Sequence, residues 1–337
     1  MSHTIILQPG GQRFVAEEGE TLLDAALRQG LSLPFGCRGG ACGACKGSLL
    51  TGRIDYGGKQ ALGLSDGERQ RGQILLCLAR PLSDLSLEIK RLGAAADIEV
   101  KTLPCRVARM ERLAEDVMRL FLKLPQQADF RFLAGQYIDI LLRDGRRRSF
   151  SLANAPASDA LLELHIRRVE GGRFTSQVFA HMQEKDLLRF EGPLGEFFLR
   201  QDSDRPVILV AGGTGFAPIK SMLEQAFAEG TQRPFHLYWG ARTVEGLYLD
   251  QLPRQWAATR SGFHYTPVLS AAAPGSHTDY RQGQVHEAVC QDFGDLSGFD
   301  VYASGPPAMV EAARSAFLAR GLDADHFHAD AFVISGD

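Results

Sequence analysis

Apolar and polar residues alternate with different periods in three successive parts of the chain, and each part predicts a different architecture. Up to about residue 92, short alternating stretches are mixed with helical ones. Between residues 100 and 201 a period of two dominates, which is typical of strands. From residue 202 onward, strand-like and helical stretches take turns. The pattern therefore predicts domains at 1–92, 100–201 and 202–337, with a linker at 93–99 where glycine and alanine accumulate.

The first part predicts a small mixed sheet with two short helices. Strand character is found at 4–9, 13–16, 47–55, around residue 77, and at 85–89. Thr21 can cap a helix that ends at Gly30, and Ser65 can form a capping box with Glu68 at the start of another. We expect an α+β domain of about ninety residues.

The middle part predicts a small antiparallel β-barrel. Its six strand-like stretches are 103–110, 117–124, 136–142, 147–152, 161–169 and 187–192. One helical stretch interrupts them, at 174–182. Short strands at this spacing, separated by turn residues, favour a barrel over an open layer.

The last part predicts an α/β doubly wound parallel sheet. Strands are expected at 207–211, 235–240, 263–270 and 299–303. Helices are expected between and after them, at 218–230, around 247–252, at 285–289 and at 307–321. Strands that alternate with helices in this way pair in parallel, because each crossover returns the chain to the same end of the sheet.

Composition and charge narrow the function classes without choosing one. The chain has 337 residues, 45% of them hydrophobic and 23% charged, with a formal net charge of −3. That balance argues against a general nucleic-acid or membrane-surface binder. The N-terminus has no basic stretch followed by an apolar run, and the most apolar stretch, near 207–219, is too short to cross a bilayer of ~30 Å. We therefore expect a cytoplasmic protein.

Four of the six cysteines form a spaced set that predicts a metal cluster. They are Cys37, Cys42, Cys45 and Cys77, arranged as C-x4-C-x2-C followed by thirty-one residues and the fourth cysteine. This spacing is typical of a plant-type [2Fe–2S] cluster. Glycines crowd the loop because it must wrap tightly around its ligands. A structural zinc site would pair two knuckles, and disulfides are rare in the cytoplasm, so both alternatives fit less well. Cys105 and Cys290 stand alone, and we expect them to be small buried residues.

The stretch RRRSFSLAN, residues 146–154, has features of a flavin-binding strand. Alternation places Arg148 and Phe150 on one face and Ser149 and Ser151 on the other. A guanidinium can bind a pyrophosphate while a neighbouring aromatic ring covers a flat heterocycle. Downstream, a helix start is expected at residues that suit phosphate binding: Gly171, Gly172, Thr175 and Ser176. A basic surface strand followed by an ordinary helix is the alternative, and the combination favours flavin.

Two glycine turns at strand ends predict a dinucleotide site. In VILVAGGTGFAPIKSM, a strand leads into Gly212, Gly213, Thr214 and Gly215, with a helix expected from Pro218. This is neither a GxGxxG fingerprint nor a P-loop, and a purely structural glycine turn remains the alternative. A second turn follows a later strand and comprises Ser304, Gly305, Pro306 and Pro307. Both turns can line the crevice where ligands bind to such sheets.

In their order, these motifs resemble the iron–sulfur flavoprotein reductases of the ferredoxin–NAD(P) reductase superfamily. The resemblance spans the chain and is carried by AGQYIDILLRDGRRRSFSLANAP, VAGGTGFAPIKSM and the C-terminal HADAF. It implies a plant-type ferredoxin domain of the β-grasp type, then an FAD-binding barrel, then an NAD(P)-binding domain. The most similar-looking members are reductase components of aromatic-ring oxygenases and CDP-6-deoxy-Δ3,4-glucoseen reductase.

The resemblance also implies roles for individual residues. The four clustered cysteines would ligate the [2Fe–2S] cluster. Arg148 would bind FAD phosphate, Phe150 would lie against the flavin, and Ser151 would lie near its N5. The rest of the FAD site would comprise Ser149, His165, Ile166, Arg167, Gly172, Phe174, Thr175 and Ser176. The nicotinamide dinucleotide would contact Gly213, Thr214, Gly215, Gly305 and Pro306, with Arg242 near its adenosine half. The catalytic set would be Ser151, Thr214, Ser304 and Phe332, the last lying over the flavin.

Two residues depart from the family pattern. Phe150 stands where tyrosine is usual, and Ser304 stands where the family's CGPPxM motif has a cysteine. The first change keeps the ring and loses a hydroxyl. The second removes a thiol from the hydride-transfer geometry, so we expect it to affect the rate of that step.

The function implied is electron transfer from NAD(P)H through FAD and the [2Fe–2S] cluster to a partner protein. We favour a terminal oxygenase as the partner. A sugar-deoxygenating dehydrase is a second possibility, and a non-enzymatic redox sensor is a third. Arg242 could bind the 2′-phosphate of NADPH, whereas Glu245 could bind the ribose of NADH, so the choice of coenzyme stays open. Arg38 and Lys46 are the charged residues of the cluster loop, and they suggest an acidic docking surface on the partner.

Overall fold

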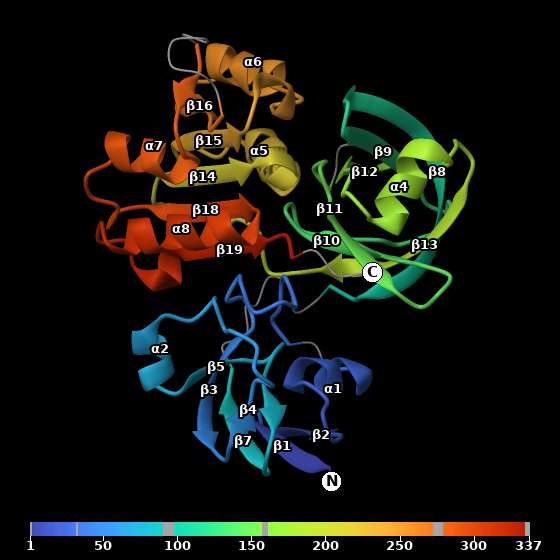
Figure 1. The fold of residues 1–337 in the computed structure, drawn as a ribbon, viewed down its shortest axis with the longest axis vertical. Helices are drawn as coiled ribbons and strands as arrows, with labels where there is room; N and C mark the ends of the chain where they lie inside the picture. Colours follow the sequence, from blue (N-terminus) through green and yellow to red (C-terminus); the bar gives the residue numbers. More distant parts are fainter. Residues whose placement is uncertain (1, 32, 90–97, 157–160, 272–278, 334–337) are drawn as a thin grey trace. The chain divides into compact units, whose positions relative to one another are not determined.

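The chain divides into two compact units. The computed structural model describes residues 2–31, 33–89, 98–156, 161–271 and 279–333. The first unit is Met1–Ile98 and the second is Glu99–Asp337. Most of the expected linker, residues 93–97, lies outside the described residues. Figure 1 colours the chain from blue in the first unit to red at the end of the second.

The first unit is built on a five-stranded mixed sheet with the order β2-β1-β7-β3-β5. β1 and β7 pair in parallel, and the other neighbours pair antiparallel. The strands are β1 (His3–Gln8), β2 (Gln12–Ala16), β3 (Lys46–Thr51), β5 (Gln73–Leu75) and β7 (Leu85–Glu88), with a small second ladder of β4 (Ile54–Asp55) and β6 (Arg80–Pro81). This is the mixed α+β arrangement that the sequence predicts.

Both helices of this unit begin at the expected caps. In α1 (Leu22–Arg28) the Thr21 side chain accepts a hydrogen bond from the Asp24 backbone N–H. In α2 (Asp66–Gln70) Ser65 and Glu68 form the full capping box. Each cap satisfies backbone donors that a helix start otherwise leaves unpaired, so these local sequence signals are sufficient to place the helices.

The second unit begins with a six-stranded antiparallel sheet in the order β11-β10-β13-β8-β9-β12. Its elements are β8 (Lys101–Ala114), β9 (Val117–Lys123), β10 (Tyr137–Leu141), β11 (Arg147–Ser151), β12 (Leu161–Arg167), α4 (Arg173–Ala180) and β13 (Leu187–Leu194). Within the described ranges no continuous ladder joins the two outer strands, β11 and β12. An isolated bridge between Leu152 and Leu164 lies just beyond the end of β11. The antiparallel strands are confirmed, and the expected closed barrel is not found.

A six-stranded parallel sheet follows, in the order β17-β16-β15-β14-β18-β19. Every neighbouring pair in it runs parallel. Its strands are β14 (Val207–Gly212), β15 (Phe235–Ala241), β16 (Phe263–Leu269), β17 (Arg281–Gln282), β18 (Asp300–Gly305) and β19 (Phe327–Ala331). The accompanying helices are η1 (Gly213–Gly215), α5 (Phe216–Ala228), η2 (Val244–Gly246), α6 (Gln251–Thr259), α7 (Val285–Asp292), α8 (Pro307–Leu318) and η3 (Ala324–His326).

Several features of this sheet differ from the sequence prediction, and the short strand β17 is one that was not predicted. Helical turns begin at Gly213 rather than at Pro218, so the glycine turn is itself the first part of the helix. α6 begins several residues later than expected. β19 was not predicted, because Phe327–Ala331 mixes polar and apolar residues and lacks the apolar run of a buried strand.

Each sheet of the second unit has its own apolar core. Ile138, Ile140 and Phe190 lie in the core of the antiparallel sheet. Leu209, Phe216 and Trp239 lie in the core of the parallel sheet, where Phe216 and Trp239 stack with ring centroids 4.0 Å apart. None of the helices in the described part of the chain has both the length and the apolar character needed to cross a membrane.

Candidate functional site

The four spaced cysteines are brought together in the first unit. Cys37, Cys42 and Cys45 lie in the loop before β3, and Cys77 lies just after β5, which pairs with β3. Cys42, Cys45 and Cys77 are almost fully buried. Backbone N–H groups of Gly39 and Cys42 donate to the Cys37 sulfur, each at 3.4 Å. The loop therefore offers the thiolates and the backbone donors that suit an iron–sulfur cluster.

The thiols associate in two pairs, Cys37 with Cys42 and Cys45 with Cys77. A hydrogen bond from Cys42 is the largest influence that lowers the pKa of Cys37, to about 6. The same contact and burial raise the pKa of Cys42, while the contact with Cys77 and burial raise the pKa of Cys45. Within the described ranges, no three His, Cys, Asp or Glu side chains are placed to hold a single metal ion. Two pairs of thiols fit a cluster with two irons.

Glycines allow the loop to close around these thiols. A Cβ added at Gly63 would lie 2.5 Å from the backbone nitrogen of Gly43, so a side chain there would push the two segments apart. Gly40 has φ +78°, and a Cβ there would lie 2.3 Å from Cδ1 of Leu78. The glycine-rich composition thus reflects close backbone approach, as predicted.

The two cations of the cluster loop are in different situations. The ammonium of Lys46 forms a 2.5 Å ion pair with Glu68, whose side chain is only 8% exposed. The guanidinium of Arg38 lies 4.7 Å from the ring centroid of Phe35. Glu68 is distant in sequence, so the sequence argument from the charges of the loop alone missed it. The acidic docking surface that Arg38 and Lys46 suggest stays a prediction, in which the ion pair with Glu68 offsets the charge of Lys46.

The predicted flavin strand is β11, and each of its two serines donates a hydrogen bond to an aspartate carboxylate. Ser149 donates to Asp139 at 2.5 Å, and Ser151 donates to Asp330 at 3.3 Å. On the other face, the Phe150 ring lies 5.6 Å from that of Phe174 in the first turn of α4. Arg148 is partly exposed and donates to the backbone oxygen of its neighbour, Arg147. The alternation predicted for this strand is therefore present.

The start of α4 has backbone donors available. Gly172 is its N-cap and supplies no side-chain hydrogen bond. Thr175 is buried and its hydroxyl accepts from the Val169 N–H at 3.1 Å, so this side chain stabilises the turn itself. Ser176 is exposed in the first turn. An uncapped helix start beside a basic strand can bind a phosphate.

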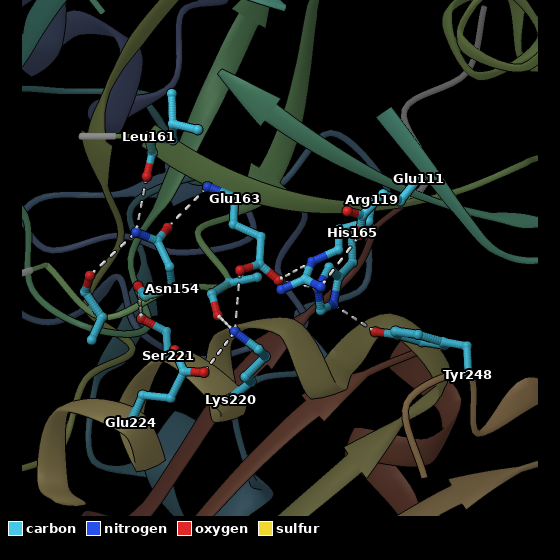
Figure 2. A network of polar contacts seen from close by, with 12 residues as sticks. Glu111, Arg119, Asn154, Leu161, Glu163, His165, Lys220, Ser221, Glu224 and Tyr248 are labelled. Carbon is cyan, nitrogen blue, oxygen red and sulfur yellow. Dashed lines mark hydrogen bonds and ion pairs between the residues drawn. The ribbon is translucent and has the colours of Figure 1, made fainter. Parts of the chain in front are cut away.

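The three predicted flavin-site residues at the end of β12, His165, Ile166 and Arg167, have different surroundings. His165 is buried, and its ring nitrogens contact Tyr248 Oη at 2.9 Å and Glu163 Oε1 at 2.8 Å (Figure 2). Burial lowers the pKa of His165. Ile166 is fully buried in the core. Both nitrogens of the His165 imidazole therefore have protein partners. Of these three residues, Arg167 is the one best placed to contact a ligand.

Arg167 points toward the dinucleotide turn. One of its terminal nitrogens donates to Asp116 at 2.7 Å. Its Nε and its other terminal nitrogen are buried without a hydrogen-bond partner. A Cβ at Gly213 would lie 3.4 Å from that unpaired nitrogen. The end of β12 and the glycine turn after β14 are therefore adjacent, with unused donors between them.

The two predicted glycine turns adjoin each other. β14 and β18 are neighbouring parallel strands, with Ala211 opposite Ser304. A Cβ at Gly215 would lie 2.0 Å from the carbonyl oxygen of Ser304, so only glycine permits this contact. Trp239 donates to the Gly213 carbonyl at 2.9 Å and fixes the first turn from the adjoining strand. Thr214 is half-buried at the centre of that turn. The turns therefore meet at the carboxyl ends of the strands, where ligands bind to such sheets.

Ser304 and the end of β19 complete this region. Ser304 is fully buried, and its hydroxyl has no hydrogen-bond partner. It lies opposite Asp330 in the sheet, and Asp330 in turn accepts from Ser151 of the flavin strand. Gly305, which precedes Pro306, accepts a 2.9 Å hydrogen bond from the backbone of Phe332. The segments that carry the four predicted catalytic residues thus adjoin one another in this region.

The remaining predicted site residues lie farther along the sheet edge. Arg242 follows β15 directly, is exposed, and has a backbone carbonyl that accepts from Ala271. Glu245 is exposed one turn later. Of the two isolated cysteines, Cys105 is buried, which raises its pKa to about 12, and Cys290 is half-buried.

Sequence reasoning missed three residues of this region. Asp330 contacts the flavin strand, although the HADAF stretch predicts a contact only for its aromatic residue. Glu163 and Lys220 form a buried ion pair between β12 and α5. A charged residue inside an otherwise apolar strand or helix was the available signal, since such a charge must find a partner.

Comparison with known proteins agrees with this geometry. Three family profiles match the chain in succession: the 2Fe-2S iron-sulfur cluster binding domain at 5–82, the oxidoreductase FAD-binding domain at 104–199, and the oxidoreductase NAD-binding domain at 209–315.

Full-length relatives share the whole arrangement. The CDP-6-deoxy-L-threo-D-glycero-4-hexulose-3-dehydrase reductase of Yersinia pestis is 40% identical over 99% of this chain and 100% of its own. Reductase component 1 of the terephthalate 1,2-dioxygenase of a Comamonas species is 38% identical over 99% of this chain and 98% of its own. Among solved structures, a cytochrome P450 reductase from Amycolatopsis matches with a TM-score of 0.77 at 35% identity, covering 98% of both chains. The chain therefore belongs to the iron–sulfur flavoprotein reductases of the ferredoxin–NAD(P) reductase superfamily, and it is an NAD(P)H-dependent oxidoreductase with FAD and a [2Fe–2S] cluster.

Proposed function

We propose that this chain passes electrons from NAD(P)H to a separate partner protein and that this acceptor is a terminal oxygenase. The observation that carries this choice of acceptor is the similarity to reductases of a dioxygenase and of a cytochrome P450, and the hydrogen bond from Ser151 to Asp330 supports the electron path within the chain. That hydrogen bond links β11, the proposed flavin strand, to β19, which pairs with the strand that carries Ser304. When bound, NAD(P)H supplies two electrons as hydride, FAD passes them on singly, and the cluster carries one at a time.

Each group would be held by residues described above. Cys37 and Cys42 would ligate one iron, and Cys45 and Cys77 the other. This proposal rests on the two pairs of thiols and on the chemistry of the donor set. Backbone donors to the Cys37 sulfur would stabilise the charge of the cluster.

The flavin would lie along β11 and the start of α4. Arg148 and the N–H groups at the α4 start would bind its phosphates, and Phe150, packed on Phe174, would lie against its ring system. Ser151 would hold a proton near the flavin nitrogen, with Asp330 orienting its hydroxyl. Ser149 lies on the same face, is bound to Asp139, and would order the strand.

The nicotinamide dinucleotide would lie across the two glycine turns. The turn from Gly213 to Gly215 permits close backbone approach, and Arg167 offers unpaired donors beside it. The unpaired hydroxyl of Ser304 would face the reacting end of the coenzyme. Phe332 would cover the flavin, and Arg242 would contact the adenosine half.

The proposed domain bounds remain 1–92, 100–201 and 202–337, with the linker at 93–99. The division of the chain near residue 98 and the ranges of the three family profiles support them. We retain a barrel-like FAD domain and a doubly wound NAD(P) domain as the finer description of the fold. A cytoplasmic location remains a prediction, which rests on the need to keep the cluster thiols reduced.

A dehydrase that removes oxygen from a sugar nucleotide is the second candidate acceptor. The similarity to the Yersinia pestis enzyme, 40% over its full length, favours it. The similarity to reductases of a dioxygenase and of a cytochrome P450 favours the oxygenase. The redox-sensor alternative lacks such support, because these three full-length relatives are all named as reductases.

The experiment that tests the acceptor is reconstitution with both classes of protein. The purified reductase would be mixed in turn with a terminal oxygenase and with a hexulose dehydrase, each with its substrate, and NAD(P)H oxidation coupled to product would be measured. The proposal predicts faster coupled turnover with the oxygenase. Turnover only with the dehydrase would overturn it and leave the electron-transfer activity itself intact.

A further inference from the structure

A buried clamp joins the flavin strand to the helix that follows the dinucleotide turn. Two α5 side chains reach the segment just after Ser151: Lys220 donates to the Ala153 carbonyl at 2.9 Å, and Ser221 donates to the Asn154 carbonyl at 2.7 Å. Figure 2 shows both contacts converging from the helix on this segment. Since α5 continues directly from Gly215, the clamp lies close to both sets of predicted ligand contacts.

The ammonium of Lys220 is held by two carboxylates away from water. Lys220 is 3% exposed, and its nitrogen lies 3.2 Å from Glu163 and 2.8 Å from Glu224. Glu163 is also buried and receives a second cation, Arg119, at 2.9 Å. The free-energy cost of removing these charges from water offsets much of their mutual attraction. A buried ion pair is therefore weak evidence for stability, and it fits better with a role in fixing one arrangement of β12 and α5.

A second chain of contacts runs in parallel from the same carboxylate. Glu163 contacts His165, His165 contacts the Tyr248 hydroxyl, and the Tyr248 ring packs edge-on against Trp239 at 5.2 Å. Trp239 donates to the Gly213 carbonyl at 2.9 Å. Glu163 is thus connected to the dinucleotide turn at one end through Trp239 and at the other through α5.

Asn154 bonds the segment that receives these contacts to β12. Its amide donates to the Leu161 carbonyl at 3.1 Å, and its oxygen accepts from the Glu163 N–H at 2.9 Å. The carbonyls that Lys220 and Ser221 use therefore lie on a segment that Asn154 bonds to the start of β12.

We propose that Lys220, Ser221 and Glu163 are positioning residues for the hydride step, holding the nicotinamide turn at a fixed distance and angle from the flavin strand. This rests on the proposed function. None of them is among the residues assigned above to flavin or coenzyme, and they would act by fixing the two elements that carry those residues. Hydride transfer is sensitive to such geometry, since a displacement of about 1 Å can slow a reaction on the order of a hundredfold.

The test measures flavin reduction in the full-length holoprotein by stopped flow. Lys220→Met removes the charged contact and Ser221→Ala removes the neutral one. Gln225→Ala is the matched control, because Gln225 lies on the same helix and its side-chain amide donates to Glu229, one turn farther along the chain. Each protein would be compared for FAD content, limiting reduction rate, the absorbance of the nicotinamide–flavin charge-transfer complex, and the kinetic isotope effect with coenzyme deuterated at C4.

We expect Lys220→Met to lower the limiting reduction rate by on the order of tenfold and Ser221→Ala by a smaller factor. Charge-transfer absorbance should fall and the isotope effect should rise in both, while FAD content and the rate of ferricyanide reduction by dithionite-reduced enzyme stay at wild-type values. The control should match the wild type throughout.

The proposal would be overturned if Ser221→Ala and Lys220→Met kept the wild-type limiting rate and charge-transfer absorbance and showed only a lower melting temperature. That result would mean that the two residues have a purely structural role. If Lys220→Met does not retain FAD, Ser221→Ala and Lys220→Arg decide the question in the same way. NAD(P)H oxidation by the wild type with ferricyanide as acceptor tests the proposed electron-transfer activity separately. Its absence would count against that activity, whereas wild-type behaviour of the variants would count against the clamp.

Discussion

Replacing Glu163 by glutamine should destabilise the second unit substantially at neutral pH. The side chain is 5% exposed and contacts Arg119, His165 and Lys220. Burial alone would raise the pKa of this carboxyl, but the hydrogen bonds from His165 and Arg119 and the charge of Lys220 outweigh it and lower the pKa to about 2, from an ordinary value of 4.5. The difference, 4.5 − 2 = 2.5, corresponds at ~1.36 kcal/mol for each unit of pKa to about 3 kcal/mol. The cost of breaking a buried pair, roughly 3–5 kcal/mol, is similar.

The direction of the pH dependence follows from the lowered pKa. A folded-state pKa below the unfolded value means that the charged carboxylate stabilises the fold fully above about pH 4.5 and that this stabilisation is lost as pH falls toward 2. The difference between wild type and Glu163→Gln should therefore stay constant from pH 8 to pH 5. A loss of about 3 kcal/mol in a unit of this size lowers the melting temperature by roughly 6–12 °C.

The assay is thermal unfolding followed by flavin fluorescence, with Glu224→Gln as the control. Glu224 also pairs with Lys220, but its side chain is 28% exposed and the pair has i,i+4 helical spacing, worth only about 0.5 kcal/mol. We expect this control to melt close to the wild type. Equal melting temperatures for Glu163→Gln and wild type, or equal losses in both variants, would refute the argument that the buried carboxylate is the centre of the network.

Three further changes test the candidate site. Gly215→Ala should slow the reduction of flavin by NAD(P)H at least tenfold with FAD still bound, because the new Cβ would lie 2.0 Å from the Ser304 carbonyl and force β14 and β18 apart. Stopped-flow rates at the wild-type value would contradict this. Arg148→Ala should release FAD, since a charge-assisted phosphate contact contributes roughly 1.5–3 kcal/mol, about ten- to a hundredfold in affinity; full flavin absorbance after extensive dialysis would count against the assignment. Ser304→Cys should change the flavin reduction rate by more than it changes FAD content, and identical rates would mean that the missing thiol has no effect.

Local sequence signals predicted the elements whose stabilising contacts are also local. Both helix caps of the first unit involve residues three apart, and both were predicted correctly. The cysteine spacing and the glycine turns could also be recognised in the sequence, because binding a cluster or a dinucleotide requires particular residues at particular separations along the chain.

What the sequence did not reveal depends on contacts between distant residues. Glu68 neutralises Lys46 from twenty-two residues away, and Asp330 meets Ser151 across two different sheets. β19 was missed because its burial comes from pairing with β18 and not from an apolar run of its own. Lys220 could be flagged as a charge in an apolar helix, but only the fold identifies its partners on β12 and the segment after β11.

The central claim is a relay in which flavin and nucleotide act in the second unit and the cluster acts in the first. Cys77→Ser tests it most directly, because Cys77 lies in the first unit, residues 1–98, and the flavin and nucleotide motifs lie in the second. Cys290→Ser, a half-buried cysteine of the second unit, is the control and should retain both activities below.

The measurement is NAD(P)H oxidation by two acceptors in the same preparation. With Cys77→Ser, ferricyanide reduction, which can draw electrons straight from flavin, should persist at near the wild-type rate. Cytochrome c reduction, which requires the cluster, should collapse. Equal loss of both activities, or loss of neither, would contradict the relay from nucleotide to flavin to cluster.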